Sequence, residues 1–288
     1  RGLGDVYKRQ ARADVPILMI TASHETDTRY EALNLGANDF LTKPIDRVEF
    51  SARSRNMLSL RTGQKFLADR AAHLDALVSE QTQEIRNREQ ELIFRMSRAA
   101  EFRDPETGAH IQRMAYYSQI IAKGLGLDEK IQKLILEAAP MHDVGKIGIP
   151  DYILLKPGKL TFEEFEVMKN HAKLGHELLK GSGSEILRAG AEIAISHHEK
   201  YDGSGYPFGL VGTKIPLFGR IVAVADVFDA LTSERPYKKA WPLADARKFL
   251  EDGRGAHFDP MCVEAFLAGW DEALEIRQRF QDEEAPMI

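Results

Sequence analysis

The pattern of apolar and polar positions begins with a short stretch typical of an α/β fold. Residues 16–22 form an almost continuous apolar run of the kind found in buried parallel strands, and residues 38–44 predict a second short strand. Between them, residues 25–35 have a helical pattern that ends at Gly36. The pattern predicts a strand, a helix and a second strand in that order.

A charged segment without proline follows, from residue 45 to residue 104. Within it, one row with alternating spacings of four and three is mainly apolar: Leu67, Ala71, Leu74, Val78, Gln81, Ile85, Arg88 and Leu92. This spacing indicates a coiled coil with two polar interruptions, and the alternative is a single amphipathic helix that lies on the next domain. We expect a two-helix seam, because a long helix is difficult to stabilise alone in water.

From about residue 97 the apolar spacing predicts one helix after another. The expected helices are 111–124, 128–141, 161–180, 184–197, 217–233, 242–252 and 260–280, and glycine and proline mark the turns between them. The expected fold class is mainly α: a helical bundle preceded by a helical linker and an α/β fragment. We expect the three parts to span residues 1–60, 61–96 and 97–288.

Composition narrows the functional classes. The 288 residues suffice for one or two domains with a sizeable core, and a net charge of −5 leaves no basic footprint for duplex nucleic acid. Cys262 is the only cysteine, so no internal disulfide can form, as in a reducing cytosol. The sequence shows no targeting leader. It also has no apolar run that approaches the length of a membrane span, roughly 18 residues. We therefore expect a soluble, cytoplasmic protein with no membrane partner.

The chemistry of the helical part centres on the adjacent pair His142 and Asp143. An imidazole beside a carboxylate suits a divalent ion such as Mn²⁺, Fe²⁺ or Zn²⁺, and a carboxylate can also bridge two ions. One such pair alone is more often a helix cap or a surface ion pair. A metal site therefore requires further ligands at workable spacings.

Further ligand-type residues recur along the same part of the chain. Glu106 and His110 are four residues apart, which on a helix places them on one face. Asp226 and Asp229 lie together on a later helical run. The candidate ligands are Glu106, His110, His142, Asp143, His171, His197, His198 and Asp226. Eight ligands exceed the needs of one ion, so we expect a site for two or three.

These segments, followed by Gly205-Tyr206-Pro207, resemble the HD-GYP family of cyclic di-GMP phosphodiesterases over about residues 97–270. The resemblance implies that all eight candidates bind metal and that Asp143 is the bridging ligand. Two ions can then lower the pKa of a shared water and stabilise the oxygens of an in-line displacement. Iron or manganese is expected, because the ligands are nitrogen and oxygen atoms without a thiolate.

The resemblance also implies roles for residues that hold the substrate. Lys146 lies one turn beyond His142, and we assign it to a phosphate oxygen or to proton transfer. Tyr206, Arg235 and Lys238 are expected to bind substrate, because guanidinium binds phosphate bidentately and stacks on bases, whereas lysine acts as a point charge.

The first part of the chain, with Lys43-Pro44 after the second strand, resembles the C-terminal part of a response-regulator receiver domain, a flavodoxin-like fold. The match would make Thr21, Phe40 and Lys43 the switch residues. Only twenty residues precede Thr21, so we expect the phosphoacceptor aspartate to be absent. We interpret this part as a truncated receiver.

The leading hypothesis is a metal-dependent phosphodiesterase that opens cyclic di-GMP to linear pGpG in bacterial two-component signalling, with a further step to GMP left open. One alternative is hydrolysis of another cyclic dinucleotide, cyclic GMP-AMP. Another is a catalytically silent binding module, against which the complete ligand set argues. Expected partners are cyclic di-GMP, a second copy of the chain bound through the helical linker, and signalling proteins.

Overall fold

The computed structural model describes residues 15–22, 30, 33–101, 108–234 and 239–281. The chain divides into two compact units, which meet between Arg86 and Asn87. One helix, α3 (Arg47–Glu101), continues through this division and through the boundaries expected after residues 60 and 96. Those domain boundaries remain predictions.

The first unit contains a parallel pair of strands, β1 (Leu18–Thr21) and β2 (Asp39–Thr42). Both strands lie within the predicted ranges, and the register pairs Leu18 with Asp39. Helix α3 begins directly afterwards, because the Asp46 carboxylate accepts hydrogen bonds from the N–H groups of the first turn. Nη1 of Arg53 on α3 then donates to both carboxylate oxygens of Asp39 on β2, at 2.8 and 2.7 Å.

Helix α3 changes from exposed to buried toward its C-terminal end. The side chains of Leu67, Leu74 and Val78 are exposed, whereas Ile93 and Ala100 belong to the core of the second unit. Within that unit, Glu89 accepts a hydrogen bond from Ser184 Oγ at 2.7 Å. The apolar row of the predicted seam is therefore left without cover among the described residues of this single chain.

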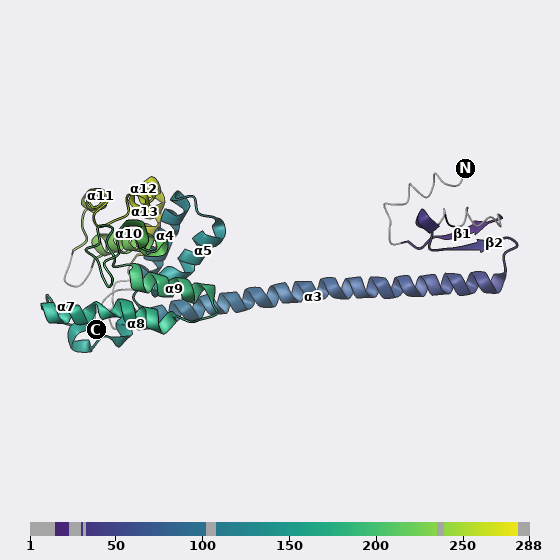
Figure 1. Cartoon of the computed structure of the whole chain (residues 1–288), viewed down its shortest axis with the longest axis horizontal. Helices are drawn as coiled ribbons and strands as arrows, with labels where there is room; N and C mark the ends of the chain where they lie inside the picture. The colour runs from purple at the N-terminus through teal and green to yellow at the C-terminus, as the bar shows by residue number, and fades with distance from the viewer. Residues whose placement is uncertain (1–14, 23–29, 31–32, 102–107, 235–238, 282–288) are drawn as a thin grey trace. The chain divides into compact units, whose positions relative to one another are not determined.

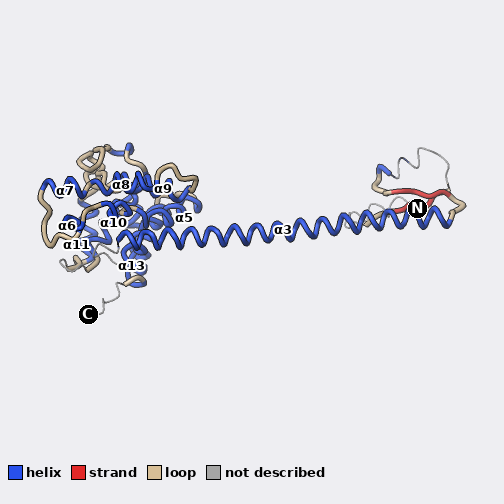
Figure 2. Tube along the Cα trace, turned by 90° about the horizontal axis from the view of Figure 1, so that it is seen from below, coloured by secondary structure: helices blue, strands red, loops and turns tan. Residues whose placement is uncertain are grey.

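The second unit is a bundle of helices, as predicted (Figure 1). Its longer helices are α4 (Gly108–Gly124), α5 (Glu129–Ala138), α7 (Phe162–Met168), α8 (Asn170–Leu179), α9 (Glu185–Ser196), α10 (Leu217–Thr232), α11 (Leu243–Asp252), α12 (Pro260–Ala268) and α13 (Trp270–Arg279). Short helical turns connect them at η2 (Ala139–Met141), η3 (Val144–Gly148), α6 (Asp151–Leu154) and η4 (Gly212–Lys214). The blue and tan segments of Figure 2 show the same succession of helices and loops.

Two predicted helices are each divided in the structure. The range 161–180 becomes α7 and α8, and the range 260–280 becomes α12 and α13. The second division falls at Gly269, where an added Cβ would lie 2.3 Å from Cγ2 of Ile120 on α4. The chain can approach α4 this closely only because the residue at this position has no side chain.

The core of the second unit joins α4, α10 and α12 through three buried aromatic rings. The ring of Tyr117 meets those of Phe228 and Phe266 edge to face at 5.2 and 5.9 Å, and the latter two are 4.8 Å apart. Edge-to-face rings at such distances add to the energy of apolar burial. This cluster fixes α4 beside α10, the two helices that carry His110 and Asp226. Among the described residues, no helix is both long and apolar enough to cross a membrane.

Candidate metal centre

The pair His142 and Asp143 lies in a tight turn between η2 and η3. Pro140, within η2, lacks the N–H group that a continuing α-helix would need, so α5 ends earlier than predicted and the chain tightens. Both side chains of the pair are buried, His142 completely. The local sequence therefore places two ligand-type residues inside the bundle.

Asp143 lies in a group of four ligand-type side chains with His171, His197 and His198. Its Oδ1 atom is 3.2 Å from Nε2 of His171, which α8 supplies, and 3.4 Å from Nε2 of His197, at the end of α9. The His198 ring lies 3.9 Å from that of His197 and 4.9 Å from that of His171, centre to centre. Two separate elements, α8 and the end of α9, thus converge on one carboxylate oxygen.

A second group joins His110, His142 and Asp226. Oδ1 of Asp226 is 3.8 Å from Nε2 of His110 and 3.9 Å from Nε2 of His142. The two groups adjoin each other, because Nε2 of His142 is 3.4 Å from Oδ2 of Asp143. The two oxygens of Asp143 therefore face different ligand groups.

The hydrogen bonds made by Nδ1 determine which ring nitrogen faces the centre. Nδ1 of His142 contacts the carbonyl of Ala139 at 3.2 Å, and Nδ1 of His197 contacts the carbonyl of Ile193 at 3.1 Å. A carbonyl can only accept, so Nδ1 carries the proton and Nε2 keeps its lone pair. Hydrogen bonds of this kind orient metal-ligating histidines in proteins.

A contact of the same kind, made by His171, lies where the helix predicted over 161–180 is divided. Nδ1 of His171 donates to the carbonyl of Met168 at 2.7 Å. In a continuous helix the N–H of Ala172 would occupy this carbonyl, but here it donates to Lys169 at 3.4 Å. The His171 ring is thus oriented by a carbonyl at the point where α7 ends.

The electrostatics of the centre suit a cation. Burial raises the pKa of Asp143, but Lys146 and His142 outweigh it and hold that pKa well below its usual range. Burial lowers the pKa of His197, and burial together with the neighbouring His197 and His171 holds the pKa of His198 well below normal. Ionised carboxylate and neutral imidazole are the protonation states that bind metal.

Buried polar atoms provide the test of whether these residues fit an ion. Within the described part of the chain, Nε2 of His171, Nε2 of His197 and Oδ1 of Asp143 are buried and have no hydrogen-bond partner. Leaving such atoms unsatisfied costs about 1–3 kcal/mol each. A divalent cation would satisfy all three, so the residues present fit a metal.

Close packing at Gly145 brings the two ligand segments together. A Cβ at this position would lie 1.9 Å from the carbonyl oxygen of His171 and 2.4 Å from the N–H nitrogen of Gly175. Only glycine allows η3 to approach α8 so closely. The glycine after the His-Asp pair is therefore part of the site's architecture.

The loop that contains Tyr206 packs over the histidines. The Tyr206 ring lies 4.7 Å from that of His198, and burial together with Asp143 and Asp226 raises the phenol pKa. The buried carboxylate of Glu199 holds this loop by accepting the N–H groups of Phe208 at 2.7 Å and Leu210 at 3.0 Å. Glu199 was not among the residues predicted for the site, although its place directly after the His-His pair is a usable signal.

Lys146 lies beside Asp143, with Nζ 2.7 Å from Oδ2. Asp229 was noted only as a neighbour of Asp226, but the structure places its carboxylate 2.7 Å from Nδ1 of His110 and 2.6 Å from Nε of Arg113. The three-residue spacings place His110 with Arg113, and Asp226 with Asp229, on one helix face each, but spacing alone does not show that these two faces meet. Glu106, Arg235 and Lys238 lie outside the described residues.

Comparisons with known proteins match both parts of the chain to known families. The family model described as "HD domain" matches residues 95–262, and the one described as "Response regulator receiver domain" matches residues 5–55. The cyclic di-GMP phosphodiesterase response regulator RpfG of Xanthomonas campestris pv. campestris is 48% identical over 93% of this chain and 71% of its own length.

Two other relatives differ in the substrate that their names carry. A cyclic di-GMP phosphodiesterase of Thermotoga maritima is 40% identical over 93% of this chain and 75% of its own length. A 3'3'-cGAMP-specific phosphodiesterase of Vibrio cholerae is 46% identical over 69% of this chain and 38% of its own length. The likeness to the Xanthomonas and Thermotoga relatives extends over almost the whole chain.

Proposed function

The chain belongs to the HD-domain family of metal-dependent phosphohydrolases, and from that premise we propose that it hydrolyses cyclic di-GMP to linear pGpG. The relatives from Xanthomonas and Thermotoga, each similar over 93% of this chain, are named for this activity. The receiver-like first part is in keeping with a role in two-component signalling. A second hydrolysis, from pGpG to GMP, is left to experiment.

The observation that carries the proposal is the position of Asp143 between two groups of ligand-type side chains. Oδ1 faces His171 and His197, and Oδ2 faces His142. A carboxylate arranged in this way suits the bridge of a two-metal site, which is a recurrent arrangement in phosphodiester hydrolysis.

We assign the ligands accordingly. One ion would be held by Asp143, His171, His197 and His198, and a second by His110, His142, Asp226 and the other oxygen of Asp143. When bound, such ions activate water and stabilise the charge that develops on phosphate oxygens. We propose iron or manganese, because the donors are nitrogen and oxygen, and Glu106 as a ligand that would extend the site to a third ion.

The chain's own residues would prepare the substrate for attack. The ammonium of Lys146, which is mostly buried, keeps Asp143 ionised and offers a positive charge to a phosphate oxygen. Tyr206 keeps its proton because its pKa is raised, so its hydroxyl can donate to the substrate. Arg235 and Lys238 remain proposed substrate contacts, supported by the family resemblance and by the affinity of guanidinium for phosphate.

Cyclic GMP-AMP is the second candidate substrate. The observation in its favour is the relative from Vibrio cholerae, named as cGAMP-specific and 46% identical over 69% of this chain. The two substrates differ in one base, so discrimination would depend on contacts to that base. A catalytically silent module is disfavoured, since each of the seven proposed ligands within the described residues belongs to one of the two groups.

We further propose that two copies of the chain associate through α3. A single copy exposes the apolar row Leu67, Leu74, Val78, Ile85 and Leu92, and an equivalent row on a second helix would cover it. A change in this pairing is the means by which signalling partners would act on the catalytic unit. A cytoplasmic location is proposed with it, since the single cysteine suits a reducing compartment.

The deciding experiment uses the full chain purified without oxygen, with metal counted by mass spectrometry and products identified by chromatography. We expect at least two ions per chain, conversion of cyclic di-GMP to pGpG, and slower conversion of 3'3'-cyclic GMP-AMP. Asp143→Ala is the control and should remove turnover while the helical circular dichroism remains. Faster turnover of cyclic GMP-AMP would favour the second candidate. A metal-replete chain that hydrolyses neither would overturn the proposal.

A further inference from the structure

The imidazole of His110 is oriented differently from those of three other histidines of the metal centre. Nδ1 of His142, His171 and His197 each contacts a backbone carbonyl three or four residues earlier in its own segment. Nδ1 of His110 instead lies 2.7 Å from Oδ2 of Asp229, a side chain on another helix. The orientation of His110 therefore depends on how α4 packs against α10.

Asp229 is itself fixed by Arg113. Nε of Arg113 donates to Oδ1 at 2.6 Å and Nη2 donates to Oδ2 at 2.9 Å. The hydroxyl of Ser233 also donates to Oδ2, at 3.0 Å. The side chains of Arg113 and Asp229 are almost fully buried, with 3% and 1% of their surfaces exposed, respectively. A bidentate pair of this kind fixes the plane of the carboxylate as well as its charge.

We propose that Asp229 and Arg113 are positioning residues for the half of the metal centre formed by His110 and Asp226. Asp229 holds the proton of His110 on Nδ1 and so presents the lone pair of Nε2 to the ion, and Arg113 holds Asp229 in the orientation that does this. The inference rests on the proposed function, because it assigns these residues to the ion site of that enzyme.

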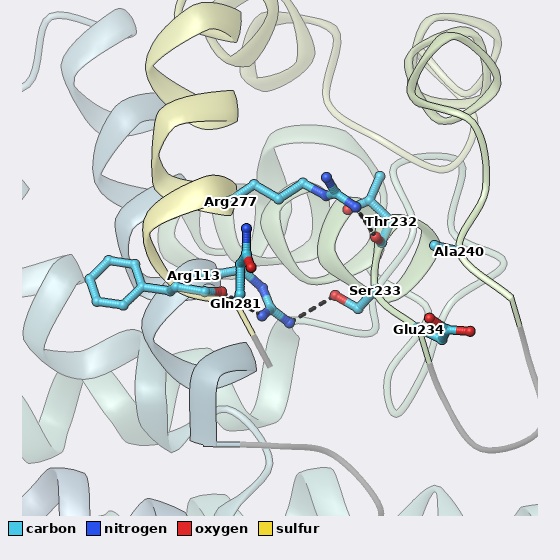
Figure 3. Close-up of a pocket in the computed structure, with 8 residues that line it drawn as sticks. Arg113, Thr232, Ser233, Glu234, Ala240, Arg277 and Gln281 are labelled. Carbon is cyan, nitrogen blue, oxygen red and sulfur yellow. Dashed lines mark hydrogen bonds between the residues drawn. The ribbon is translucent and has the colours of Figure 1, made fainter. Parts of the chain in front are cut away.

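Arg113 also connects this half of the centre to the end of the bundle. Its Nη1 donates to the carbonyl of Phe280, which follows α13, at 2.8 Å. The guanidinium lines a cavity of about 250 Å³ with Ser233, Arg277 and Gln281 (Figure 3). In Figure 3 the side chain of Arg113 reaches Ser233, and that of Arg277 reaches Thr232. One guanidinium therefore contacts the ends of α10 and α13 together with the carboxylate that orients His110.

An asparagine at position 229 separates positioning from mere packing. It keeps the shape of Asp229 but offers one acceptor oxygen and one N–H₂ donor in place of two acceptors. Because Arg113 presents only donors, the oxygen turns to Arg113 and the N–H₂ turns to His110. His110 must then accept at Nδ1 and carry its proton on Nε2, where it blocks metal ligation.

The test measures zinc binding and ring protonation in the full chain, without any nucleotide. Zn²⁺ is titrated against a competing chelator, and nitrogen-15 spectra of histidine report which ring nitrogen is protonated, with the His110 signals assigned from His110→Gln. For Asp229→Asn we expect one Zn²⁺ per chain to bind about 10–100-fold more weakly. We also expect the Nε2 signal of His110 to take the protonated position.

A second substitution distinguishes positioning from a structural role. In Asp229→Asn combined with Arg113→Met, no guanidinium competes for the asparagine oxygen, which can turn back to His110. We expect this double variant to regain most of the lost zinc affinity and the unprotonated Nε2 signal. Arg277→Met is the matched control: Arg277 lines the same cavity but contacts the carbonyl of Thr232 at 3.0 Å, so zinc binding should stay at the wild-type value.

Two results would overturn the inference. One is wild-type zinc affinity and an unprotonated Nε2 in Asp229→Asn, and the other is a double variant that binds zinc no better than Asp229→Asn alone. The proposed function fails separately, in the wild-type chain, if no cyclic dinucleotide is hydrolysed. The zinc and nitrogen-15 measurements retain their meaning in that case, because neither depends on turnover.

Discussion

Lys146 places its ammonium nitrogen 2.7 Å from Oδ2 of Asp143, three residues earlier in the same turn. Both side chains are about nine-tenths buried, so the charges attract each other with little screening by water. The ammonium contacts one oxygen of the carboxylate, while Oδ1 faces His171 and His197. Lys146 thus stabilises the charge of Asp143 and leaves its other oxygen directed at the ligand histidines.

Replacing Lys146 by methionine should weaken both metal retention and turnover. Among the neighbours of Asp143, Lys146 contributes most to its low pKa, so this pKa should rise in the variant. A carboxyl group with a lowered pKa stays ionised at every pH above that pKa. As the pH falls through the pKa, Asp143 is protonated and no longer serves as a metal ligand. We therefore expect Lys146→Met to release metal at a higher pH than the wild type, and turnover to fall about 10–100-fold.

Metal content measured over a descending pH series checks this expectation. The control is Lys123→Met, because Lys123 pairs with Glu272 at 3.1 Å on the surface, where ion pairs contribute little. Release of metal at the same pH from Lys146→Met and from the wild type would show that Lys146 does not support the charge of Asp143.

An alanine at position 145 should separate the two ligand segments. Its Cβ would meet the carbonyl oxygen of His171 at 1.9 Å, so η3 and α8 must move apart. We expect Gly145→Ala to lower the free energy of unfolding by about 1–3 kcal/mol and to reduce metal occupancy. Urea unfolding and metal counting measure the two effects.

Gly183→Ala is the matched control in the same unit. Nothing lies within 4 Å of a Cβ at that position, so the change in unfolding free energy should stay within about 0.5 kcal/mol. Equal stability and full metal occupancy in Gly145→Ala would contradict the close-packing argument.

The main features of the fold and of the centre could be predicted because each has a local signal. Helix spacing predicts a bundle, and two adjacent ligand pairs within it predict a metal site. Asp143 and His197 indeed meet inside the second unit. The two short strands were predictable as well from apolar runs such as 16–22, but the expectation of a buried strand was wrong, because the residues of β1 are half-buried or exposed.

Features that depend on particular side-chain contacts, whether local or between distant segments, could not be read from the chain. The apolar period continues across 161–180, yet the helix divides where the His171 ring takes the carbonyl of Met168 and the Asn170 side chain takes that of Glu166. The partner of Asp229 lies 116 residues away, on α4. Sequence spacing shows which residues share a face, whereas tertiary contacts decide which faces meet.

The carboxylate of Glu199 should be required for the placement of the Tyr206 loop. It accepts two backbone N–H groups, those of Phe208 and Leu210, and a glutamine would offer one of them an N–H₂ donor instead. A buried unsatisfied group costs about 1–3 kcal/mol, so we expect Glu199→Gln to lose stability of that order. Because the loop is a proposed substrate contact, KM for cyclic di-GMP should rise more than kcat falls.

Steady-state kinetics and thermal unfolding test this pair of effects. Glu264→Gln makes the same chemical change at an exposed position of α12 and should leave both the kinetic constants and the stability unchanged. A Glu199→Gln variant with lower kcat and unaltered KM would place the effect on chemistry rather than on binding.

Charge introduced into the exposed apolar row of α3 should prevent self-association. A glutamate at position 74 would face its counterpart in a second copy, where like charges in an apolar seam are unfavourable. We expect Leu74→Glu to convert a dimer to a monomer in analytical ultracentrifugation. Ser79→Glu, exposed on the same helix but outside the row, should remain a dimer. A wild-type chain that is monomeric at micromolar concentration would contradict the proposed seam.

The single cysteine should be inert in the folded chain. Cys262 of α12 is fully buried, and burial together with nearby Asp259 raises the pKa of its thiol to about 12. The reactive species is the thiolate, so at pH 8 we expect no reaction with an aromatic disulfide reagent until urea unfolds the chain, and then one thiol per chain. Ser79→Cys, exposed on α3, should add one thiol that reacts immediately. Rapid labelling of the native wild-type chain would mean that α12 opens readily and that its core contacts are weak.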